Sequence, residues 1–271
     1  MTGYQVSRSA PRNAFVPSPV FVGIVALTVV SAWMAWTGFG NVRVDVFLLV
    51  VCGWLVSLCL HEYAHALVAF LCGDRGVAER GYLRLNPLKY TSPVLSIILP
   101  IIAVVLGGIG LPGGAVWVDH SVIRSKAQES LISLAGPATN LILAVVCAVP
   151  FWFGGGQDIT FSGGELGGAH ANFWVGLAAL GFLQVTASIL NFVPVPGLDG
   201  GNIIRPWLNA QYQRAYSLFA PYGFILLFLL LWQSRVNVWF FSVVGYVTNA
   251  IGIPDALGEF GLFWMRFWSE F

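Results

Sequence analysis

Three side chains that can bind or activate a metal stand close together in the sequence: His61, Glu62 and His65 form the pattern HExxH within a long apolar run. On a helix, residues four positions apart lie on one face, so both imidazoles can reach a single metal ion. Glu62 lies beside them, where its carboxylate could take a proton from a water held at that metal. This residue set is typical of a zinc-dependent peptide hydrolase.

Two simpler interpretations of HExxH are less favoured. With so few His and Glu residues, chance produces the pattern on the order of once per thousand such chains. A purely structural polar cluster is costly inside a bilayer, because each ionisable group there needs a partner or a water-filled cavity. The pattern therefore favours a functional metal site.

A catalytic zinc site usually has three protein ligands, so a third ligand is expected elsewhere in the chain. Asp199 is the best candidate, because it lies in the stretch NFVPVPGLDGG at positions 191–201, which ends a later apolar run. Its prolines break the helix and place the carboxylate on irregular backbone, which membranes tolerate only around a cavity or inside protein. Taken alone, such a loop is more often a plain turn. His120 and His170 lie near segment ends and have less local support.

Membrane-spanning helices must position these residues. Apolar residues make up 57% of the chain and charged residues 9%, whereas soluble domains carry about 25% charged residues. A span needs about 20 mostly apolar residues, and candidate runs occur at 20–36, 45–72, 131–153, 173–190 and 217–232, with ambiguous stretches at 94–109 and 238–253. We expect an all-α polytopic membrane protein with about six transmembrane helices. The net charge of +1 argues against nucleic acid as a partner.

The two metal motifs constrain the topology, because both lie toward the C-terminal ends of their helices. Their ligands must meet at one depth in the membrane, so these two ends must lie on the same side. Those ends share a side only if the stretch 94–109 enters the bilayer and returns through 111–119. We therefore predict a re-entrant and extended segment at about 94–123, including a short hairpin-like loop. Of the 13 Lys and Arg residues, all but Arg43, Arg235 and Arg266 then share one side, which the positive-inside rule makes cytoplasmic, together with the amino terminus and the active site.

Two further segments have predicted roles. The stretch AVWV at 115–118 could pair with an extended substrate by strand addition, although a plain loop fits it equally well. The aromatic tail at 254–271 is typical of a helix lying at the membrane interface.

HExxH in one membrane helix and NxxPxPxLDG in a later one resemble the site-2 proteases, the intramembrane zinc metalloproteases. The stretch AGPATN at 135–140 resembles the family's AGPxxN segment, and LNPLK at 85–89 resembles a loop that follows HExxH in short bacterial members. The resemblance covers roughly residues 45–205, the expected catalytic core of a single membrane-embedded domain spanning 1–271. We expect no PDZ or CBS domain, because the polar intervals are too short to hold one.

The resemblance implies one Zn2+ per chain, with His61, His65 and Asp199 as ligands, Glu62 as general base and Asn191 as an asparagine that holds substrate or oxyanion. It implies regulated intramembrane proteolysis in the lipid bilayer of a bacterial inner (plasma) membrane. The substrate would be a single-span membrane protein, such as an anti-sigma factor, or a signal-peptide remnant. The alternatives are a membrane zinc transporter, which would not need Glu62 as a base, and an inactive homologue that binds membrane segments.

Overall fold

The structure, a computed structural model, describes residues 13–90, 102, 116–162 and 165–268. In these ranges the chain is largely helical. The described strands are β1 (Thr160–Ser162) and β2 (Glu165–Gly167), which pair antiparallel in one small hairpin. The predicted all-α architecture is thereby confirmed.

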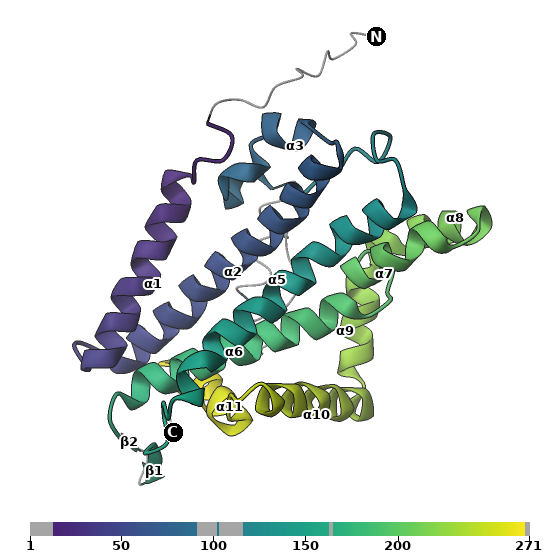
Figure 1. Cartoon of the computed structure of the whole chain (residues 1–271). Helices are drawn as coiled ribbons and strands as arrows, with labels where there is room; N and C mark the ends of the chain where they lie inside the picture. Colours follow the sequence, from purple (N-terminus) through teal and green to yellow (C-terminus); the bar gives the residue numbers. More distant parts are fainter. Residues whose placement is uncertain (1–12, 91–101, 103–115, 163–164, 269–271) are drawn as a thin grey trace.

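Four helices are long and apolar enough to cross a membrane by length and composition: α1 (Pro19–Thr37), α2 (Val42–Cys72), α5 (Lys126–Trp152) and α6 (Ala171–Phe192). They pack in the pairs α1–α2, α2–α5, α5–α6 and α2–α6, so α2 lies at the centre (Figure 1). Asn41 caps the start of α2 by accepting the backbone N–H groups of Arg43 and Val44, and Gly73 ends it at a φ of 120°. The four helices match the first four predicted runs.

The remaining helices form two bent pairs, each of which could be one further span, giving up to six in the described residues. The first pair bends by 71° between α8 (Ala210–Phe219) with η5 (Ala220–Tyr222) and α9 (Gly223–Trp232); the second bends by 114° between α10 (Ser234–Ala250) and α11 (Asp255–Trp264). The predicted run 217–232 is therefore not one straight helix. Pro221 within it cannot donate a backbone hydrogen bond, and Gly223 lies against the carbonyl of Pro196.

Three short elements follow α2 and fold back toward the start of α1: α3 (Gly76–Glu79), η1 (Tyr82–Arg84) and η2 (Pro87–Lys89). The backbone N–H of Ser18, the residue that caps α1, donates to the carbonyl of Arg84 at 2.8 Å. Val77 and Leu83 are fully buried in a cluster with residues from the last turns of α2. The end of α2 and the start of α1 therefore lie on the same side of the bundle.

The segment before α5 lies at this same end, because the N–H of Asp119 donates to the carboxylate of Asp74 at 2.8 Å. At the opposite end of the bundle, His170 precedes α6 and stacks on Trp36 of α1, with ring centroids 3.7 Å apart. Helices α2 and α6 therefore finish on one side. Most of the predicted re-entrant range lies outside the described residues, so re-entry stays a prediction. The hydrogen bond between Asp119 and Asp74 agrees with it, because it places the end of that range on the side where α2 finishes.

The predicted tail helix is α11, which packs across α6. Gly258 and Gly261 allow this close approach, since a Cβ at either position would crowd backbone carbonyls of α6. Trp264 is buried, and its indole N–H donates to Asn172 at 2.9 Å. Part of the aromatic tail thus contacts protein, and its position at the membrane interface stays a prediction.

Candidate metal centre and active site

The structure brings the three predicted ligands together although Asp199 lies 134 positions after His65 in the sequence. The Nε2 atoms of His61 and His65 are 3.0 Å apart. One carboxylate oxygen of Asp199, Oδ2, lies 3.2 Å from Nε2 of His61 and 3.4 Å from Nε2 of His65. Both histidines are buried.

This geometry fits a tetrahedral zinc ion. With metal–ligand bonds of about 2.0–2.1 Å, the ligand atoms of a tetrahedral site are about 3.3 Å apart. The three observed separations, 3.0, 3.2 and 3.4 Å, bracket that value. Two histidines and a carboxylate also form the ligand set of a common class of catalytic zinc site, in which the fourth position is left for water or substrate.

Hydrogen bonds at the Nδ1 atoms fix the orientation of the two imidazole rings. Nδ1 of His65 lies 2.7 Å from the carbonyl of Ile132, which can only accept, so this nitrogen carries the proton. Nδ1 of His61 lies 2.7 Å from the amide oxygen of Asn140 in the same way. In the neutral imidazole, the form that binds a metal, each Nε2 atom then directs its lone pair toward the Asp199 oxygen, an arrangement that a cation stabilises. Such partners orient metal-binding histidines and increase their basicity.

Helix α5 also leaves the space that a metal needs. A Cβ at Gly136 would lie 2.5 Å from Nε2 of His61 and closer still to Nε2 of His65. No side chain larger than glycine fits there without moving the imidazoles. Gly136 and Asn140 belong to the AGPxxN segment, which sequence analysis located without giving either residue a role.

Asp199 begins the short helix α7 (Asp199–Ile204), and its loop is held by close backbone contacts. Gly197 adopts a φ of +90°, which other residues rarely adopt, and a Cβ there would collide with the carbonyl of Ala220. The hydroxyl of Tyr216 donates to the carbonyl of Pro194 at 2.6 Å. On the other side of α7, Ser130 of α5 donates to the carbonyl of Ile203 at 2.6 Å.

Glu62, the predicted base, is 2% exposed and accepts a hydrogen bond from the backbone N–H of Val116 at 3.2 Å. Two further contacts hold the stretch that carries Val116. Arg80 donates to the carbonyl of Trp117 at 3.1 Å, and buried Asp74 accepts from both Arg80 and the N–H of Asp119. Asp74 thus connects the end of α2 to the stretch that contacts Glu62, a role that nothing in its sequence context indicated.

Asp119, at the end of this stretch, is half-buried. The hydroxyl of Ser121 donates to its carboxylate at 2.6 Å and the N–H of Ser121 at 3.0 Å, and these bonds lower the pKa of Asp119 below its ordinary value. The residues 116–119 form neither helix nor strand.

Asn191 is buried in the last turn of α6, eight positions before Asp199. Among the described residues its amide makes no hydrogen bond to the three ligand candidates or to Glu62, so its predicted role stays a prediction. The weaker metal candidates lie elsewhere: His120 is exposed, 4.0 Å from Glu129, and His170 packs on Trp36 at the opposite end of the bundle.

Comparison with known proteins agrees with this site. The family model described as Peptidase family M50 matches residues 49–230, which include all five predicted site residues. The chain is 44% identical to Rip2 of Mycolicibacterium smegmatis, a zinc metalloprotease by name, over 95% of this chain and 96% of that protein. It is 40% identical to Rip2 of Mycobacterium tuberculosis over 97% of this chain and 99% of that protein. YwhC of Bacillus subtilis, also named a zinc metalloprotease, is 30% identical over 65% of this chain and 76% of its own length. No solved structure matches.

Proposed function

The chain belongs to peptidase family M50 and is an intramembrane zinc metalloprotease of the site-2 protease type, and from this premise we propose which of its residues carry out the reaction. His61, His65 and Asp199 hold the zinc, Glu62 is the general base, and Asn191 binds the substrate carbonyl. The observation that carries this assignment is the convergence of the two Nε2 atoms and the Asp199 oxygen, with both Nδ1 atoms already hydrogen-bonded.

Zinc held by His61, His65 and Asp199 would supply a Lewis acid that activates water for attack and polarises the substrate carbonyl. Glu62 accepts the proton of the attacking water and then passes it to the leaving nitrogen. This transfer requires that the Glu62 carboxylate lie within hydrogen-bond reach of the substrate and take up and release one proton. The N–H of Val116 fixes one Glu62 oxygen and leaves the other to move the proton. The Asn191 amide donates to the carbonyl oxygen as negative charge develops on it.

The first test is the zinc content of the purified chain. We expect about one zinc per chain in the wild type, loss or strong weakening in His61→Ala and in Asp199→Ala, and retention in His120→Ala, which removes an imidazole outside the site. Retention of zinc in Asp199→Ala would refute its assignment as the third ligand.

Glu62→Gln separates the base from the ligands. The amide keeps the size of the carboxylate but cannot accept the proton, so we expect full zinc content with loss of cleavage of a membrane-embedded reporter substrate. A variant that still cleaved at the wild-type rate would refute the assigned base. A zinc transporter makes a different prediction, zinc uptake into sealed vesicles by the wild type.

The substrates are membrane-embedded, as the family implies, and we assign them to the single-span class: an anti-sigma factor or a signal-peptide remnant. A helical backbone hides its carbonyls in hydrogen bonds, so the cleaved bond must be extended. The stretch 116–119 lies beside Glu62 without regular structure of its own, which supports the proposal that it pairs with such a substrate.

We place the chain in a bacterial plasma membrane with its amino terminus and active site on the cytoplasmic side. Cations gather at the site end of the described helices: Arg75, Arg80, Arg84 and Lys89 follow α2, Arg124 precedes α5 and Lys126 begins it. Labelling of Lys126→Cys and Arg235→Cys by an impermeant thiol reagent on intact cells tests this. Only Arg235→Cys should react, and labelling of Lys126→Cys alone would reverse the orientation.

A further inference from the structure

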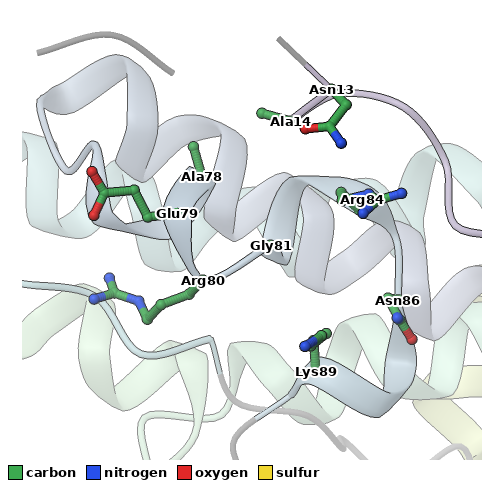
Figure 2. A pocket seen from close by; sticks show the side chains of 9 residues that line it. All are labelled: Asn13, Ala14, Ala78, Glu79, Arg80, Gly81, Arg84, Asn86 and Lys89. Carbon is green, nitrogen blue, oxygen red and sulfur yellow. The ribbon is translucent and has the colours of Figure 1, made fainter. Parts of the chain in front are cut away.

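A polar pocket of about 190 Å³ lies at the site end of the bundle, outside the metal centre. Its walls come from two parts of the chain, the residues just before α1 and the short elements after α2 (Figure 2). The lining residues are Asn13, Ala14, Ala78, Glu79, Arg80, Gly81, Arg84, Asn86 and Lys89. They include Asn86 and Lys89 of the motif LNPLK, which the protease mechanism does not use.

The balance of charge in the pocket is positive, with three cations and one carboxylate. Arg80 is already engaged, because its guanidinium binds Asp74 and the carbonyl of Trp117. Arg84 and Lys89 form no ion pair within the described part of the chain, and Arg84 makes only a long bond of 3.4 Å to the carbonyl of Val16. Figure 2 shows Glu79 pointing away from both of them. Two cations with asparagine amides beside them suit an anionic ligand.

The pocket also lies where a lipid headgroup would be. Residues 13–18 lead directly into α1, and Ser18 and Arg84 are joined by a backbone hydrogen bond of 2.8 Å. Phe15, Val16 and Leu88, next to the lining residues in sequence, are 48%, 53% and 60% exposed. Most of α1 is apolar and faces outward. A basic pocket bordered by exposed apolar side chains at the entry of a membrane helix is a setting in which anionic headgroups bind.

We propose that this pocket binds the phosphate of an anionic phospholipid, with Arg84 and Lys89 contacting the phosphate and the acyl chains lying along α1. The pocket volume of about 190 Å³ is several times the volume of about 30 Å³ that a water molecule takes up in the liquid. The pocket is therefore large enough for a phosphate group and its ester oxygens. The proposal is independent of the protease mechanism, because neither residue contacts the metal centre.

The test uses the full chain in phosphatidylcholine nanodiscs with increasing phosphatidylglycerol, and native mass spectrometry to measure bound phosphatidylglycerol per chain. Arg84→Gln combined with Lys89→Gln should weaken binding about tenfold to thirtyfold, since each cation near a membrane surface contributes about one factor of five. The matched control, Arg124→Gln with Lys126→Gln, removes one Arg and one Lys from exposed positions at the same end of the bundle. It should bind as the wild type does.

Equal weakening in both double variants would overturn the proposal, because it would show a general surface effect. Displacement of the lipid by an equal concentration of inorganic phosphate would also overturn it, because the chains would then contribute nothing. Zinc content and elution volume verify folding. If the double variant does not fold, single variants of the exposed Lys89 provide the test. Lys89→Gln should weaken lipid binding about fivefold, and Lys89→Arg should bind as the wild type does. Equal binding by these two variants would refute the assignment.

Discussion

Gly136 offers a sharp test of the metal centre, because the perturbation is one methyl group. In Gly136→Ala the new Cβ would lie 2.5 Å from Nε2 of His61, whereas carbon atoms in ordinary contact are about 3.5–4.0 Å from their neighbours. At least one imidazole must therefore move by about 1 Å, or α5 must move away from α2. Catalytic and metal-binding groups tolerate displacements of only about 0.5 Å.

The size of the effect follows from the cost of overpacking, about 1–3 kcal/mol when a methyl group is forced into a filled site. If the imidazoles move to relieve it, the same free energy is lost from metal binding. Zinc affinity should then fall between about fivefold and more than a hundredfold, at 1.4 kcal/mol per tenfold. We expect cleavage to fall at least as much.

The assay is competitive zinc titration with a fluorescent chelator, together with thermal unfolding in the same detergent. Gly23→Ala is the matched control, since Gly23 also lies in a membrane helix but a Cβ there meets nothing within 4 Å. The control should bind zinc as the wild type does. Wild-type zinc affinity in Gly136→Ala would refute the close approach of α5 to the ligands.

Three further predictions rest on the partners of the site. Asn140→Ala removes the acceptor of the His61 Nδ1 proton, so zinc affinity should fall about 10–100-fold in the same titration, while Asn140→Asp should retain most of it. Asp74→Ala releases the stretch that contacts Glu62, so the turnover number should fall with zinc content unchanged; an equal loss of zinc would show a general folding defect instead. Val118→Pro should impair cleavage at normal zinc content if the stretch pairs with substrate, and an unchanged rate would exclude pairing. Val116→Pro is the less specific variant, because it also removes the donor to Glu62.

The helices that carry the site could be predicted from the sequence because the bilayer restricts the options. An apolar run of the right length has to be a helix, and the predicted run 131–153 corresponds to α5 at Lys126–Trp152. The pairing of His61 and His65 followed from the four-residue repeat of a helix, which is a local property. The contact of both with Asp199 could not be predicted from local pattern; it was expected from the irregular loop that ends a later apolar run, and the family resemblance implied it as well.

The roles of Gly136 and Asn140 could not be predicted, for a physical reason. Each depends on the rotation of α5 against α2, and the sequence of a helix does not state which face meets which neighbour. The bend after η5 was foreseeable in part: Pro221 is a local signal for a break. Its direction depends on the contact between Gly223 and the 194–197 loop, which is again tertiary.

Helix α5 contributes no predicted metal ligand, yet it determines where the ligands lie. Its residues Ile132, Gly136 and Asn140 follow one another at steps of four, so they form a single stripe along the helix. The two outer residues accept the Nδ1 protons of His65 and His61, which are themselves four positions apart, and the middle one leaves room for the metal. Two positions before Ile132 in the same helix, Ser130 donates to a carbonyl of α7, which begins at Asp199. Helix α5 therefore contacts both motifs, through this stripe and through Ser130. Because one inserted residue turns a helix by about 100°, an insertion within 133–135 should separate Ile132 from the other two and abolish zinc binding while leaving the apolar span intact.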